Sequence, residues 1–113
     1  MLLPNSDRTY VDRTKITDYL LSLSHPDGRS KAEFFMRFGF KVEEWQLLAN
    51  VLCGVGSSNP VVNVVESPYG VRYTVDGLIK TPDGRSPKIR TIWFIERGNS
   101  VPRLITAYPK VAG

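Results

Sequence analysis

The 113-residue chain is 42% hydrophobic and 23% charged, which suits a single globular domain, residues 1–113, with one core. No apolar run approaches the roughly 20 residues that a membrane-spanning helix needs, and no signal-peptide core follows Met1, so we expect a cytoplasmic protein without membrane contacts. One cysteine and one histidine exclude an internal disulfide and are too few for a metal site, so we expect neither metal nor cofactor.

Basic residues are concentrated in the second half of the chain. Residues 1–60 hold seven Lys/Arg and seven Asp/Glu, whereas residues 61–113 hold eight and four, so the +4 excess belongs entirely to the second half. Such an asymmetry is typical of proteins that bind a polyanion or an acidic partner protein. Four surplus charges also serve simply to keep a small domain soluble, and charge alone leaves both interpretations open.

Helices are predicted for residues 14–57, after an irregular lead-in at residues 1–13. Asp12 or Thr14 can cap the first helix. Its apolar residues have the i, i+3, i+4, i+7 spacing of an amphipathic stripe, and they are Ile16, Tyr19, Leu20 and Leu23.

Two further helices follow a Pro/Gly loop. Ser30 and Glu33 have the Ser-x-x-Glu spacing of a capping box, which predicts that the second helix starts at Ser30, and Gly39 is suited to end it. The third helix is predicted to begin near Val42.

Prolines divide the second half into windows that suit strands, because proline is excluded from central strand positions. The windows are residues 61–67, 69–81, 88–101 and 103–108. Short connections between consecutive strands favour an antiparallel meander. The predicted fold is therefore α+β, with two to three N-terminal helices packed on one face of a four-stranded antiparallel sheet at residues 61–109.

The last two strands suggest a binding face. With a core side formed by Ile92, Phe94, Ile105 and Ala107, the opposite face would carry Thr91, Trp93, Thr106 and Tyr108. Hydroxyl and aromatic side chains suit a ligand better than a core. These residues are also good β-formers, so their positions need no functional explanation by themselves.

The loop before the second helix provides two candidates for chemistry. Histidine is the side chain whose ordinary pKa lies nearest neutrality, so His25 is a candidate general acid or base, although a loop histidine packed on a neighbouring helix is the simpler interpretation. Lys31, together with Arg29, stands at a helix N-terminus that attracts anions, and this pattern indicates a phosphate ligand or a solvated surface charge.

Three segments together resemble a known family: DYLLSLSHPDGRSKAEFF, YGVRYTVDG and RTIWFIERGNSVPRLITAYP. The resemblance runs from about Leu3 to Pro109 and is to a family of short bacterial domains of unknown function. In that family His-Pro-x-Gly-x-Ser-Lys-Ala-x-Phe-Phe precedes a Thr-x-Trp-Phe strand and a Thr-Ala-Tyr-Pro strand. The chain departs from the pattern at Lys41, which replaces a polar helix cap.

The resemblance implies a setting of toxin and antitoxin or immunity protein, because family members occur at the tips of polymorphic toxins and beside a small partner gene. The order of elements is also similar to the barnase/EndoU/colicin/RelE group of metal-independent RNases. The motif residues carried over by the resemblance are His25, Ser30, Lys31, Tyr69, Gly70, Arg72, Thr91, Trp93, Thr106 and Tyr108.

The leading hypothesis is a metal-independent endoribonuclease toxin that cleaves RNA by 2′-hydroxyl attack and binds a small acidic antitoxin or immunity protein. In it the catalytic residues are His25, Lys31, Thr106 and Tyr108. The substrate-binding residues are Arg72, Arg90, Thr91, Trp93 and Ser30, with Trp93 stacking on a base. The alternative is a non-catalytic basic module that binds a partner protein or nucleic acid.

Overall fold

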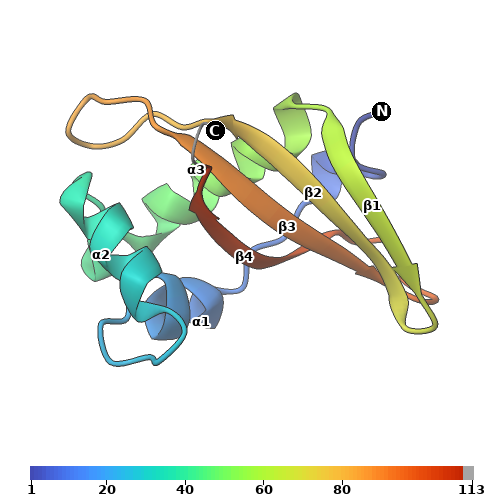
Figure 1. Cartoon of the computed structure of the whole chain (residues 1–113), viewed down its shortest axis with the longest axis horizontal. Coiled ribbons are helices and arrows are strands. Elements are labelled where there is room, and N and C mark those ends of the chain that lie inside the picture. The colour runs from blue at the N-terminus through green and yellow to red at the C-terminus, as the bar shows by residue number, and fades with distance from the viewer. Residues whose placement is uncertain (111–113) are drawn as a thin grey trace.

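The computed structural model describes residues 1–110, and in it helices precede a four-stranded antiparallel sheet of order β1-β2-β3-β4 (Figure 1). The predicted α+β meander is confirmed. The helices are α1 (Arg13–Lys15), continued by the π-helical turn η2 (Ile16–Leu20), then α2 (Arg29–Arg37) and α3 (Trp45–Ser58), with short 3-10 turns η1 (Ser6–Arg8) and η3 (Val42–Glu44). The strands are β1 (Val61–Ser67), β2 (Gly70–Leu78), β3 (Lys88–Glu96) and β4 (Arg103–Pro109). No helix among residues 1–110 is long and apolar enough to cross a membrane.

The helix ends follow the predicted signals in two places out of three. The Asp12 carboxylate caps α1 by accepting a hydrogen bond from the Thr14 amide at 2.9 Å. Gly39 follows α2 with φ of 101°, a left-handed conformation that suits glycine. The capping box is wrong: Gly28 is the N-cap of α2, and Ser30 lies inside the first turn.

The first helix is α-helical at its start, as the stripe predicted, and widens into a π-helical turn at its end. The Leu21 amide donates to the Ile16 carbonyl at 2.8 Å, an i→i+5 bond of a π-turn. Ile16 and Leu20 are fully buried, as predicted, whereas Leu23 lies beyond the helix and is 53% exposed. Tyr19 is partly buried and packs against the edge of the core.

The core lies between α3 and one face of the sheet (Figure 1). Trp93 and Thr91 are fully buried on this face. The Trp93 indole donates to Thr91 Oγ1 at 2.7 Å, and Thr91 Oγ1 donates to the Val75 carbonyl at 2.8 Å. A Cβ added at Gly56 of α3 would meet the Trp93 ring at 2.7 Å, so the indole lies directly against that helix.

The predicted composition of the open sheet face is therefore half wrong. Thr91 pairs with Ala107, so both face α3, whereas Arg90 pairs with Tyr108 on the opposite face. A β-bulge between Ile92 and Trp93 shifts the register of β4, so that Leu104 also faces the core. Thr106 and Tyr108 lie on the open face as predicted, but Thr91 and Trp93 do not.

The other predicted core residues of these strands divide in the same way. Ala107 is in the core, as predicted. Ile92 and Phe94 alternate with the buried Thr91 and Trp93 and so lie on the open face, where Ile92 is nevertheless only 9% exposed.

The helices do not all cover the same surface. α3 runs behind β2 and β3, while α1 and α2 lie to one side, beyond β4 (Figure 1). This arrangement leaves the face of the sheet opposite α3 open and brings the loop between η2 and α2 next to β4.

Candidate functional site

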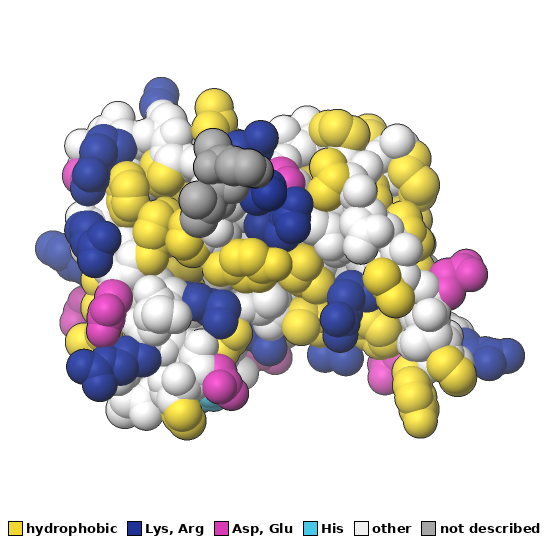
Figure 2. Space-filling view, viewed as in Figure 1, with side chains coloured by type: hydrophobic (Ala, Val, Ile, Leu, Met, Phe, Trp, Pro, Cys, Tyr) yellow, Lys and Arg dark blue, Asp and Glu magenta, His cyan; other side chains and the backbone are white. Residues whose placement is uncertain are grey.

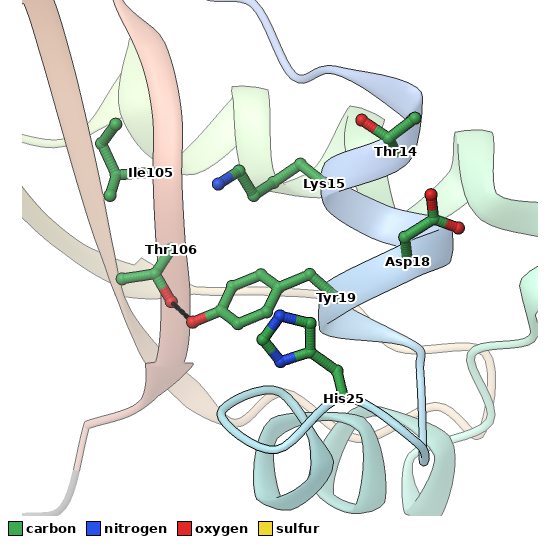
Figure 3. Close-up of a pocket in the computed structure, with 7 residues that line it drawn as sticks. All are labelled: Thr14, Lys15, Asp18, Tyr19, His25, Ile105 and Thr106. Atoms are coloured by element: carbon green, nitrogen blue, oxygen red, sulfur yellow. Dashed lines mark hydrogen bonds between the residues drawn. The ribbon is translucent and has the colours of Figure 1, made fainter.

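Two adjoining cavities follow β4 where it meets the helical segment. The larger has a volume of about 570 Å³ and is lined by Thr14, Lys15, Asp18, Tyr19, His25, Ile105 and Thr106 (Figure 3). The smaller, of about 330 Å³, is lined by Tyr19, Ser30, Lys31, Thr106, Tyr108 and Pro109. Tyr19 and Thr106 belong to both, so the two cavities form one groove, which we call the β4 groove.

A hydroxyl pair divides the β4 groove. Tyr19 Oη lies 2.9 Å from Thr106 Oγ1, and the two residues are 87 positions apart in the chain (Figure 3). The phenol therefore bridges from η2 to β4, with one cavity on each side. Because either oxygen can donate, the pair can also turn a hydrogen bond toward a ligand in either cavity.

Two ammonium groups approach the ring of Tyr19. Lys15 Nζ and Lys31 Nζ each lie 5.3 Å from the ring centroid, within the range of a cation–π interaction. The side chain of Lys15 extends toward β4, whereas Asp18 points away from Thr106 (Figure 3). Each cavity beside the Tyr19–Thr106 pair thus holds one positive charge, from Lys15 of α1 in the larger cavity and from Lys31 of α2 in the smaller.

His25 is held by its own loop. Its Nδ1 lies 3.0 Å from the backbone amides of Asp27 and Gly28 and accepts a hydrogen bond from each. An acceptor nitrogen carries no hydrogen, so the ring hydrogen of this form belongs to Nε2. The imidazole also meets the Tyr19 ring edge-on, with centroids 4.9 Å apart. His25 therefore caps the turn before α2 and offers a donor, rather than a free lone pair, to the cavity.

Close packing fixes this loop against η2. A Cβ at Gly28 would collide with the Tyr19 carbonyl, so only glycine permits the approach. Lys31 Nζ donates to the Asp27 carbonyl at 3.0 Å, which ties the lysine to the same turn. Arg29 points elsewhere, to an exposed ion pair with Glu33 at 3.1 Å.

The predicted arginines lie on the open sheet face and differ in their partners. Arg90 makes two hydrogen bonds to the Asp76 carboxylate, at 2.8 and 2.9 Å. The guanidinium lowers the pKa of Asp76 below its usual value, while the carboxylate raises the pKa of Arg90. Arg72 is exposed, and among residues 1–110 it has no carboxylate within salt-bridge distance.

Five of the nine predicted site residues line the β4 groove: His25, Ser30, Lys31, Thr106 and Tyr108. Thr91 and Trp93 are buried, and Trp93 is not available for base stacking. The sequence did not single out Tyr19 and Lys15. Their i, i+4 spacing places a lysine beside a tyrosine on one helix face. By itself this pattern predicts that Tyr19 belongs to the apolar stripe of the helix and that Lys15 is a solvated surface charge.

No group of three His, Cys, Asp or Glu side chains within residues 1–110 is arranged to hold a metal ion. Within the same residues the groove offers two ammonium groups, an imidazole donor and five hydroxyl-bearing residues, with Asp18 as its single carboxylate. Such a set suits an anionic, hydrogen-bonding ligand such as a phosphodiester.

Fold and site together define this protein as an α+β domain with a four-stranded meander and a basic groove lined by hydroxyl groups. A family model described as "Domain of unknown function (DUF6883)" matches residues 2–111, and the chain belongs to this family. The predicted resemblance to a family of uncharacterised domains is confirmed to that extent.

One solved structure is similar over nearly the whole chain. It is a chain from "Contact-dependent growth inhibition toxin - immunity protein complex from Klebsiella pneumoniae 342". The TM-score is 0.72 at 21% sequence identity, and the match covers 95% of this chain and 97% of that one. At this identity the likeness is one of fold. No curated protein matches the chain.

Proposed function

We propose that this chain is a metal-independent ribonuclease-like toxin of a toxin–immunity pair. The observation that supports this most is the Tyr19–Thr106 hydroxyl pair with an ammonium group 5.3 Å from the tyrosine ring in each cavity. RNA carries its own nucleophile, so cleavage needs proton transfer and stabilisation of a crowded phosphate rather than a protein nucleophile.

In the proposed reaction the 2′-oxygen forms a bond to phosphorus and the bond from phosphorus to the 5′-oxygen breaks. One proton leaves the 2′-hydroxyl and one reaches the 5′-oxygen, giving a 2′,3′-cyclic phosphate and a 5′-hydroxyl. Lys15 and Lys31 would neutralise the phosphate oxygens. The hydroxyls of Tyr19 and Thr106 would relay the proton from the 2′-hydroxyl to the 5′-oxygen.

The proposed role of His25 follows from its tautomer. With Nδ1 occupied by two amides, Nε2–H can donate to a phosphate oxygen. Action as a general base or acid would require the turn before α2 to release those amides. Tyr108, Ser30 and Arg72 would hold the flanking phosphate or base, and Arg90 would support them from its pair with Asp76.

Charge supports the toxin half of such a pair. The chain has a formal net charge of +4, which favours RNA and equally favours an acidic immunity protein on the same surface. The similar solved structure contains both a toxin and an immunity protein, and the basic groove fits the toxin better than its inhibitor.

The test uses the purified chain and total cellular RNA in the presence of a chelator. We expect products with 2′,3′-cyclic phosphate ends, and a 2′-deoxy residue at the cleaved position should block the reaction. Tyr19→Phe should slow cleavage about a hundredfold, as for loss of a proton-transfer group. Tyr69→Phe, which removes the same hydroxyl from an exposed tyrosine outside the groove, is the matched control. Cleavage that tolerates the 2′-deoxy residue, or none at all, would contradict the proposal.

A non-catalytic binding module is the second candidate, and the His25 geometry favours it. Its Nδ1 is saturated by backbone amides, as expected of a structural histidine. In this case the chain would bind RNA or an acidic protein at the β4 groove without cleaving RNA, and expression in bacteria would not arrest growth.

A further inference from the structure

The open face of the sheet carries an aromatic ring between two arginines. Phe94 of β3 pairs with Arg72 of β2 on one side and with Arg103 of β4 on the other. Directly opposed residues on one sheet face have side chains in contact range. The Arg103 guanidinium carbon lies 5.6 Å from the centroid of the Phe94 ring. We call these three residues the Phe94 platform.

The ring is seated on a glycine. A Cβ at Gly70 would meet Phe94 Cζ at 2.7 Å, so the ring lies over the backbone of β2, where only glycine leaves room. Phe94 is half-buried, and both arginines are exposed. One side of the ring is thus supported by the sheet, and the platform faces away from α3.

The charge of the platform is uncompensated. Within residues 1–110 neither Arg72 nor Arg103 has a carboxylate within 4.0 Å, unlike Arg90, which is paired with Asp76. Figure 2 shows basic side chains around a hydrophobic strip in the middle of this face. Two guanidinium groups without a carboxylate partner in the described part of the chain, one of them over an aromatic ring, match a nucleotide, which presents a phosphate and a flat base.

The platform adjoins the β4 groove. Phe94 is two residues along β3 from Ile92, which pairs with Thr106, and this separation corresponds to about 7 Å. A strand that places one phosphate at the Tyr19–Thr106 divider would therefore reach the platform with a neighbouring nucleotide.

We infer that the Phe94 platform binds an unpaired nucleotide of single-stranded RNA, with the base on Phe94 and the phosphate between Arg72 and Arg103. The inference rests on the proposed function, since it names the substrate of the β4 groove as single-stranded. A base inside a duplex has both faces covered by its neighbours, so only an unpaired base can lie on an aromatic ring. The platform takes the role that the sequence assigned to Trp93, which is buried.

The experiment measures binding of a fluorescently labelled, non-cleavable 2′-deoxy oligonucleotide, single-stranded and annealed to its complement, at several salt concentrations. Phe94→Leu should weaken single-strand binding about tenfold, because one stacked base is lost, while leaving the salt dependence and duplex binding unchanged. Phe94→Tyr retains the ring and should bind as the wild type does. Arg103→Gln should reduce the slope of log affinity against log salt by about one.

Equal binding by Phe94→Leu and wild type, or equal losses in Phe94→Leu and Phe94→Tyr, would overturn the inference. So would a wild type that does not bind the single strand at low salt, which would favour a protein partner on this face. Thermal melting of each variant establishes that it is folded. A wild type that binds the oligonucleotide but leaves RNA intact would contradict the proposed cleavage and support the platform. RNA cleavage by the wild type, together with unchanged oligonucleotide binding by Phe94→Leu, would support the proposed cleavage and contradict the platform.

Discussion

His25 is the residue at which structural and chemical roles meet. Its Nδ1 accepts from the Asp27 and Gly28 amides, and its ring contacts Tyr19. An alanine substitution would remove both nitrogens together and confuse the two roles. Asparagine and glutamine separate them, because Asn Oδ1 can replace the Nδ1 acceptor, whereas Gln Nε2 can replace the distal donor.

We expect His25→Asn to retain the melting temperature and to lose RNA cleavage about a hundredfold if Nε2 acts on the substrate. His25→Gln should show the opposite pairing, with a lower melting temperature and activity that survives in the folded fraction. Melting curves and cleavage rates on the same preparations check this. Full cleavage activity in His25→Asn would show that His25 only stabilises the turn before α2 and takes no part in cleavage.

The pair of Arg90 and Asp76 links adjacent strands and predicts a pH dependence. The Asp76 side chain is only 10% exposed, and the hydrogen bond from Arg90 lowers its pKa in the folded state. A carboxylate with a lowered folded-state pKa stabilises the protein at pH above its unfolded pKa, near 3.8. That stabilisation is lost as the pH falls through the lowered value.

We therefore expect Asp76→Asn to reduce the free energy of unfolding at pH 7 by about 2 kcal/mol, the range for hydrogen bonds to charged groups. The difference from the wild type should shrink as the pH falls below about 3.8. Urea unfolding at neutral and acidic pH measures it. A difference that stays constant with pH would show that the ion pair is not its source.

At the scale of elements, the approach of α3 to the sheet depends on one glycine. Gly56 faces the Trp93 ring, whereas nothing lies within 4 Å of a Cβ placed at Gly54, two residues earlier in the same helix. The two positions therefore have the same residue type in the same helix and differ only in how closely the sheet packs against them.

Gly56→Ala should lower the free energy of unfolding by about 1–3 kcal/mol, as expected when a methyl group is forced into a packed core. Gly54→Ala should raise it by about 0.5–1 kcal/mol, since alanine is the better helix former. Chemical denaturation of both variants checks the pair. Equal effects at the two positions would contradict the close contact of α3 with Trp93.

At the scale of the whole molecule, one side of the sheet is packed against a helix and the other is open. α3 covers one side and forms the core, while α1 and α2 beyond β4 leave the other side open (Figure 1). Lys15 of α1 and Lys31 of α2 line the border between the helices and this open side, and Arg72 of β2 lies on the open side itself.

RNA binding should therefore depend on where a charge is removed rather than on net charge. We expect Lys15→Gln and Arg72→Gln each to reduce the slope of log affinity against log salt by about one. Lys41→Gln changes the net charge equally but lies between α2 and α3, and it should leave the slope unchanged. Salt titrations of a short single strand compare them. Equal slopes for all three would contradict a localised interface.

By itself, the sequence determined the order and class of the elements. The spacing of Ile16 and Leu20 predicted a buried helix face, and prolines delimited windows that contain the strands. These signals are local, because a helical stripe or a proline acts within a few residues. The loop candidates His25 and Lys31 were found in the same way, from a motif within one segment.

Only the tertiary structure decided which face of β3 is the core. That strand has apolar residues on both faces, so alternation could not orient it, and a bulge opposite Ile92 then shifted the pairing of β4. Tyr19 became a site residue through its hydrogen bond to Thr106, 87 positions away in the chain. Register and long-range contacts depend on how whole elements pack together, and no local pattern in the sequence encodes that choice.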